Sequence, residues 1–78
     1  TTSSFDWDGW IEDVLVAGSG LSEEWQRFLE NKLRVIAMQL ERENSVAVDA
    51  IVAGLVTKLH NSDEIGVEDV IEILEGGV

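Results

Sequence analysis

Cysteine, proline and tyrosine are absent from this chain of 78 residues, and histidine occurs once. Because there is no cysteine, no disulfide can stabilise a small core, and the composition fits a reducing compartment. A catalytic serine would have to be activated by His60. Ser62 shares a polar turn with His60, but no third group is placed to orient the imidazole. We therefore expect no catalytic residues and no enzyme activity.

Positive charge is scarce, with five lysines and arginines against sixteen aspartates and glutamates and a net charge of −11. Phosphate backbones and acidic lipid head groups attract lysine and arginine, so we expect neither nucleic acid nor a membrane as a partner. No apolar run approaches the roughly 20 residues that a membrane span requires. These absences predict a single soluble domain, residues 1–78, in the cytoplasm.

A metal site has only a partial pattern in its favour. Four residues match positions one, three, six and twelve of an EF-hand register, namely Asn61, Asp63, Gly66 and Glu72. However, Ile65 stands where that loop needs an oxygen ligand, and Glu68 stands where it needs an apolar side chain. We therefore expect no metal ion and no cofactor.

Apolar residues recur at spacings of three and four in four segments, the pattern of amphipathic helices. This pattern predicts helices over residues 5–16, 22–42, 46–60 and 67–75. Ser22 and Asn44-Ser45 are expected to cap the second and third helices. The Gly-Ser-rich stretch 17–20 predicts a flexible joint. With Gly66 as N-cap, Ile65 and Val70 occupy the positions of a hydrophobic staple.

Short connections between these helices predict an all-α fold, an antiparallel four-helix bundle made of two helical hairpins. The chain divides near Asn44-Ser45 into residues 1–44 and 45–78, two halves of one domain. Two other folds stay open at this point. The second and third helices can merge into one, or the chain can adopt a histone-like dimerising fold, which needs a long uninterrupted central helix.

The apolar faces are the expected interface, since burial of one Leu, Val or Ile contributes roughly 1.5–3 kcal/mol before entropy is subtracted. We expect ten residues there: Trp10, Trp25, Leu29, Leu33, Ile36, Leu55, Leu59, Val70, Ile71 and Leu74. The aromatic-rich residues 5–10 form either a docking helix for a partner's groove or the fourth helix of this chain's own core. Gly54 either lets another helix approach closely or is a tolerated glycine in a thin core.

Charge is divided unevenly along the chain. Residues 1–20 carry a net charge of −4, residues 21–44 carry −1, and residues 45–78 carry −6. Complementary charge of this kind favours recognition of a protein partner. We expect the acids of the last helix to face the bases of the second, the residues being Glu68, Asp69 and Glu72 on one side and Arg27, Lys32 and Arg34 on the other.

Residues 55–74, LVTKLHNSDEIGVEDVIEIL, resemble the C-terminal tails of modular polyketide synthase subunits. In trans-acyltransferase assembly lines, tails of this kind are docking domains without catalytic residues. The resemblance implies a four-helix bundle to which each of two consecutive subunits contributes a helical pair. Residues 46–76 would then be the upstream pair. Residues 5–42 would be the downstream pair or further helices of one chain, and the partner would be the consecutive megasynthase subunit in antibiotic biosynthesis.

Two other functions fit the same sequence. An acidic protein that mimics DNA can occupy the basic groove of a nucleic-acid-binding protein, and it needs carboxylates arrayed on one face. A general helical adaptor needs only the apolar faces. The sequence leaves open the partner, the oligomeric state, and whether the chain is one natural domain or two fused docking elements.

Overall fold

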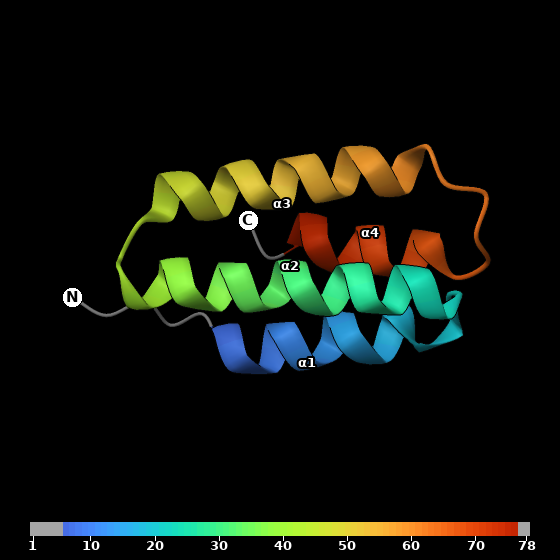
Figure 1. Cartoon of the computed structure of the whole chain (residues 1–78), viewed down its shortest axis with the longest axis horizontal. Helices are drawn as coiled ribbons and strands as arrows, with labels where there is room; N and C mark the ends of the chain where they lie inside the picture. The colour runs from blue at the N-terminus through green and yellow to red at the C-terminus, as the bar shows by residue number, and fades with distance from the viewer. Residues whose placement is uncertain (1–5, 77–78) are drawn as a thin grey trace.

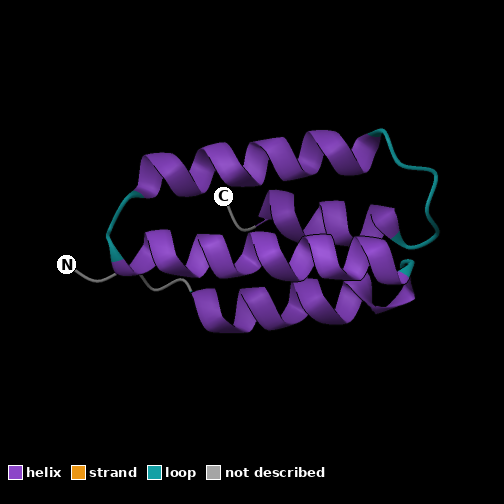
Figure 2. Ribbon diagram, viewed as in Figure 1, coloured by secondary structure: helices purple, strands orange, loops and turns teal. Residues whose placement is uncertain are grey.

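The computed structural model describes residues 6–76, and all regular structure in that range is helical. The elements are α1 (Trp7–Ala17), a short 3-10 turn η1 (Gly18–Gly20), α2 (Glu23–Glu41), α3 (Ser45–His60) and α4 (Val67–Gly76). Figure 2 shows these helices and the loops that connect them. The all-α prediction is confirmed, and the helix bounds agree with the expected ones to within two residues. Phe5, the expected start of the first helix, lies outside the described residues.

Three helices begin at a side chain that caps the free amides of the first turn. The carboxylate of Asp6 accepts a hydrogen bond from the amide of Gly9 at 3.1 Å. The Ser22 hydroxyl accepts one from Trp25, and the Asn44 side chain accepts one from Ala47 at 3.2 Å. Local sequence therefore sets where α1, α2 and α3 begin.

A tight turn separates α2 from α3. The amide of Asn44 donates to the carbonyl of Gln39 at 2.9 Å, and the amide of Glu43 donates to Leu40 at 3.0 Å. This is the Schellman pattern that ends a helix, and it places Glu43 in the left-handed region with φ 56°. A merged second and third helix is therefore wrong. The long central helix of a histone-like fold is absent from residues 6–76, since α2 has 19 residues.

The Gly-Ser stretch is an ordered turn, so the prediction of a flexible joint is wrong. Gly18 is buried, and a Cβ added to it would lie 2.6 Å from Leu29 Cδ1. The side-chain amide of Gln26 donates to the carbonyls of Ser19 at 3.1 Å and Leu21 at 2.7 Å. Gly18 thus packs closely against Leu29 of α2, and an added methyl group would force the Leu29 side chain to move. Composition alone does not distinguish that role from flexibility.

The expected hydrophobic staple at the start of α4 is also absent. Ile65 is 87% exposed, whereas Val70 is fully buried. Gly66 has φ +90° and turns the chain, so that the side chain before it points away from the core. The residue that enters the core from this loop is Val67, the first residue of α4.

The four helices lie along the long axis of a body 39 × 19 × 17 Å in extent (Figure 1). α2 packs against α3, α3 against α4, α4 against α1, and α1 against α2. Each helix thus has two neighbours, and α2 and α4 do not pack against each other. Within residues 6–76, no helix is long and apolar enough to cross a membrane.

Candidate docking surfaces

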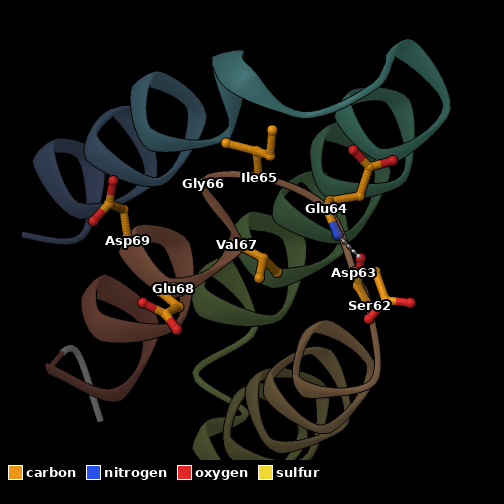
Figure 3. Close-up of a pocket in the computed structure, with 8 residues that line it drawn as sticks. All are labelled: Ser62, Asp63, Glu64, Ile65, Gly66, Val67, Glu68 and Asp69. Carbon is orange, nitrogen blue, oxygen red and sulfur yellow. Dashed lines mark hydrogen bonds between the residues drawn. The ribbon is translucent and has the colours of Figure 1, made fainter.

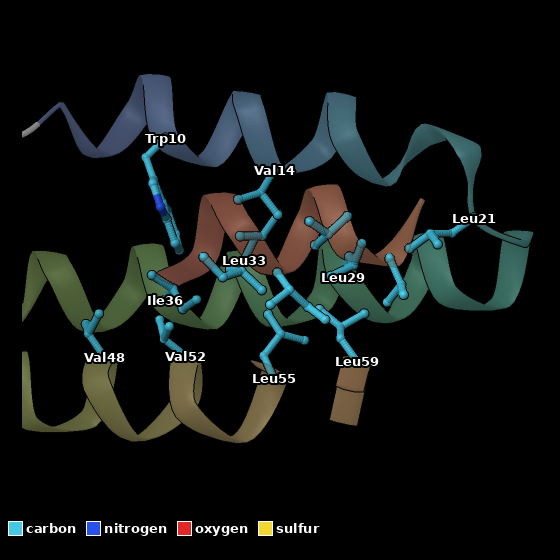
Figure 4. Packing of buried hydrophobic residues seen from close by; sticks show 14 residues of the cluster. Trp10, Val14, Leu21, Leu29, Leu33, Ile36, Val48, Val52, Leu55 and Leu59 are labelled. Atoms are coloured by element: carbon cyan, nitrogen blue, oxygen red, sulfur yellow. The ribbon is translucent and has the colours of Figure 1, made fainter. Parts of the chain in front are cut away.

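A single apolar core lies between the four helices (Figure 4). Nine of the ten apolar residues expected at an interface are buried in it: Trp10, Leu29, Leu33, Ile36, Leu55, Leu59, Val70, Ile71 and Leu74. The tenth, Trp25, is half-buried and packs against the edge of the core. These side chains therefore contact this chain's own helices, and no charged residue of 6–76 is buried among them.

Five further residues complete the core: Val14, Leu21, Val48, Val52 and Val67. Their spacing already marks four of them, because Val14 lies one turn after Trp10, Val48 and Val52 lie on the apolar stripe of α3, and Val67 lies one turn before Val70 and Ile71. Leu21 carries no periodic signal. It is buried because the turn at Gly18 folds back and brings it against the core.

Trp10 joins the first half of the chain to the last helix. Its indole N–H donates a hydrogen bond of 3.0 Å to the backbone carbonyl of Ile73. The Trp7 ring meets the Trp10 ring edge-on, with 5.3 Å between centroids. A half-apolar, half-polar side chain in this position both fills the core and fixes the offset between α1 and α4.

The expected charge pairs between α2 and α4 do not form within the chain. The one ion pair of residues 6–76 joins Arg34 to Glu30 at 2.8 Å, within α2. Glu68, Asp69 and Glu72 are exposed on α4, which does not pack against α2. Arg27 and Lys32 are also exposed and form no ion pair among the described residues. The expected charge pairs require α2 and α4 to be neighbours, whereas these two helices lie diagonally across the core.

Charge is instead separated between two pairs of neighbouring helices. α1 carries three acids and no base, and α4 carries four acids and no base, so together they hold a charge of −7. α2 carries three bases and four acids, and α3 carries one of each, for a total of −1. We call the outer surface of α1 and α4 the acidic side and that of α2 and α3 the mixed side.

The loop between α3 and α4 forms a shallow polar hollow, lined by residues 62–69 (Figure 3). The Ser62 hydroxyl accepts a hydrogen bond of 3.1 Å from the amide of Glu64, which ties the loop together. His60 is exposed at the end of α3 and makes no hydrogen bond with Ser62. Within residues 6–76 no group of three His, Cys, Asp or Glu side chains is arranged to hold a metal ion.

Three adjoining hollows run along the mixed side. The first lies between Trp25 and loop residues 62–65, and the second is lined by Glu24, Trp25, Phe28 and Lys58. The third lies between α2 and α3, over Phe28, Lys32, Ala50, Ile51, Gly54 and Lys58. The second and third hollows share the lining residues Phe28 and Lys58, and we call the surface that these two hollows occupy the α2–α3 groove.

Comparisons with protein-family models, with curated proteins and with solved structures give no match for this chain.

Proposed function

We propose that this chain is a non-catalytic protein–protein docking module that joins consecutive subunits of a polyketide synthase assembly line. In this proposal the four helices form an antiparallel bundle made of two hairpins, residues 1–44 and 45–78. Figure 1 supports the arrangement, because the colour gradient reverses direction at each connection between helices. The resemblance of residues 55–74 to docking tails supplies the pathway, and the packing supports the mechanism.

One observation carries the proposal: the core lies across the boundary between the two halves. Six buried apolar residues come from residues 6–44 and eight from residues 45–76. The α2–α3 and α1–α4 contacts both cross the boundary, and so does the hydrogen bond from Trp10 to Ile73. Each half alone would leave its share of these buried side chains exposed to water, so the apolar contacts favour association of the two halves.

Affinity in such a module comes from apolar burial, and geometry comes from a few directional contacts. Burying a side chain such as Leu33 or Leu59 contributes roughly 1.5–3 kcal/mol before the entropy of association is subtracted. The Trp10 indole selects one offset of α1 along α4, because in any other register the buried donor loses its acceptor. Docking then needs no catalytic group and no cofactor.

The test is to prepare residues 1–44 and 45–78 as separate peptides and to mix them. We expect each to be poorly helical alone and the mixture to gain helix by circular dichroism, with micromolar affinity by titration calorimetry. Val70→Asp in the second peptide places a charge in the core and should abolish the gain. The matched control, Glu75→Asp on the exposed face, should bind as the parent does. Absence of association, while the intact chain unfolds cooperatively, would contradict the proposal.

A second candidate function is supported by the charge distribution. The acidic side presents seven carboxylates on two neighbouring helices without a base between them. A surface of this kind can imitate the phosphates of DNA in the basic groove of a nucleic-acid-binding protein. This function predicts tight, salt-sensitive binding of the intact chain to a basic DNA-binding protein, measured by competition against duplex DNA.

A further inference from the structure

The α2–α3 groove is an apolar surface that no described helix of this chain covers. Phe28 and Ile51 on its floor are half-buried, and Ala50 and Gly54 on its α3 wall are exposed. A Cβ added at Gly54 meets no heavy atom within 4 Å. Glycine disfavours a helix relative to alanine, and the packing of this chain does not require it. The close approach that Gly54 allows is therefore unused by helices α1 to α4.

Two basic side chains converge on the same groove from its two walls. Lys58 Nζ lies 4.4 Å from the centroid of the Phe28 ring, and Lys32 Nζ lies 5.4 Å from it. Neither ammonium forms an ion pair with a carboxylate of residues 6–76. In a chain with a net charge of −11, two of the five bases thus stand beside a half-buried apolar floor. Glu24 is the one acid that lines the α2–α3 groove, whereas Asp63 and Glu64 line the neighbouring hollow beside the α3–α4 loop.

We propose that the α2–α3 groove binds an acidic amphipathic helix of a partner protein. The apolar residues of that helix contact Phe28 and Ile51, its backbone approaches α3 over Gly54, and its carboxylates pair with Lys32 and Lys58. The lining extends about 12 Å along α3, from Ala50 to Lys58. That length matches about two turns of a bound helix, enough for anchors spaced at i, i+3, i+4 and i+7 to lie in the groove.

A second copy of this chain fits the groove less well. A two-fold contact through the groove would place lysines against lysines. The acidic side of another copy supplies carboxylates, but on α1 and α4 only Leu15 and Val16 are large apolar side chains that are exposed. The inference concerns the outer surface of the intact chain, so it does not depend on whether the halves 1–44 and 45–78 associate.

The experiment titrates the intact, ¹⁵N-labelled chain with two stapled helical peptides of about 14 residues. Both carry leucines at i, i+3, i+4 and i+7; the remaining positions are glutamate in one peptide and lysine in the other. We expect the acidic peptide to shift the amide signals of Phe28, Ile51 and Gly54, and the basic peptide to leave them unchanged. The proposal would be overturned if the amide signals of α1 and α4 shifted instead, or if no signal shifted at peptide concentrations up to about 1 mM. Dimerisation of the free chain through these residues, seen by sedimentation, would overturn it as well.

Two pairs of variants distinguish specific binding at the groove from non-specific electrostatic attraction to the protein. Gly54→Gln fills the groove and should weaken binding at least roughly tenfold while raising the melting temperature, because glycine leaves the helix. Its control, Ala53→Gln, changes an exposed residue outside the lining and should bind normally. Lys32→Glu with Lys58→Glu should weaken binding roughly tenfold, whereas Arg27→Glu with Arg34→Glu should change it less than twofold. Equal losses in the two members of either pair would refute a site at the groove.

Discussion

The indole nitrogen of Trp10 lies 3.0 Å from the carbonyl oxygen of Ile73, although the two residues are 63 positions apart in the chain. This hydrogen bond is a directional link between α1 and α4, beside the apolar contacts of the core. Trp25, by contrast, is half-buried at the edge of the core and makes no hydrogen bond through its side chain in the described residues. The two tryptophans therefore offer a direct comparison.

Trp10→Phe should lower the free energy of unfolding by about 1–3 kcal/mol, because it removes the indole donor and with it the hydrogen bond to the Ile73 carbonyl. Trp25→Phe removes an indole without that hydrogen bond and should cost less than about 1 kcal/mol. Urea unfolding of both variants, monitored by circular dichroism, measures the difference. Equal losses would show that the hydrogen bond adds nothing beyond ring packing.

Gly18→Ala should destabilise the protein by about 1–3 kcal/mol, because the new methyl group would lie 2.6 Å from the side chain of the buried Leu29. Gly20→Ala is the matched control, since a Cβ there has nothing within 4 Å. It should change stability by less than about 0.5 kcal/mol. Thermal unfolding of the two variants distinguishes an ordered turn from a tether, because a tether would tolerate both changes alike.

Glu43→Gly should stabilise the protein by about 0.5–1 kcal/mol. Glu43 is the one non-glycine residue of the described chain with positive φ, at 56°, and glycine adopts that conformation without a Cβ penalty. Glu43→Ala removes the same charge but keeps the Cβ, so it isolates the backbone effect from electrostatics. Denaturant midpoints of the three proteins should place the glycine variant highest, and an alanine variant of equal stability would assign the gain to charge.

Glu68→Lys combined with Glu72→Lys should leave the intact chain as stable as the parent or more stable. These residues are exposed on the acidic side, where removing like charge lowers repulsion. The double variant should also respond less than the parent to added salt, because salt screens that repulsion. Adding Arg27→Glu and Arg34→Glu to this double variant should not raise its melting temperature, since α2 and α4 do not pack together. Melting temperatures at low and high salt test both statements, and a rescue by the arginine changes would restore the charge pairing expected from the sequence.

Ile65→Ser should change the free energy of unfolding by less than about 0.5 kcal/mol, because the side chain is 87% exposed and forms no staple on α4. Val70→Ala, at the other end of the expected staple, should cost about 2 kcal/mol or more because Val70 is fully buried. Urea unfolding of the two variants decides the matter. A large loss in the serine variant would mean that the isoleucine does contact the helix.

Helix positions were predictable because their signals are local. Ser22 and Asn44 cap the helices that follow them, and the apolar spacing of three and four marks the side of each helix that turns inward. The same spacing identified nine of the fourteen core residues as interface residues. Leu21 was missed because it lies in a turn, where burial depends on the path of the chain and not on periodicity.

The charge pairs were not predictable in the same way. Composition shows that α4 is acidic and that α2 carries bases, but it does not say which helices are neighbours. Once α4 packs between α1 and α3, the bases of α2 lie beyond its reach. The α2–α3 groove has the same origin, since Phe28, Lys32 and Lys58 meet only when α2 and α3 lie side by side.

Amino-acid order was therefore enough to determine the helices, their caps, their apolar faces and the net charge of each. Those properties depend on contacts within about four residues along the chain. Packing decided which helices are neighbours, which glycine packs closely against another helix, and which charged side chains of residues 6–76 form no ion pair. Burial of the shared core is not directional, so neighbours are selected by shape and by the few specific contacts, such as Trp10 with Ile73, that only one arrangement satisfies.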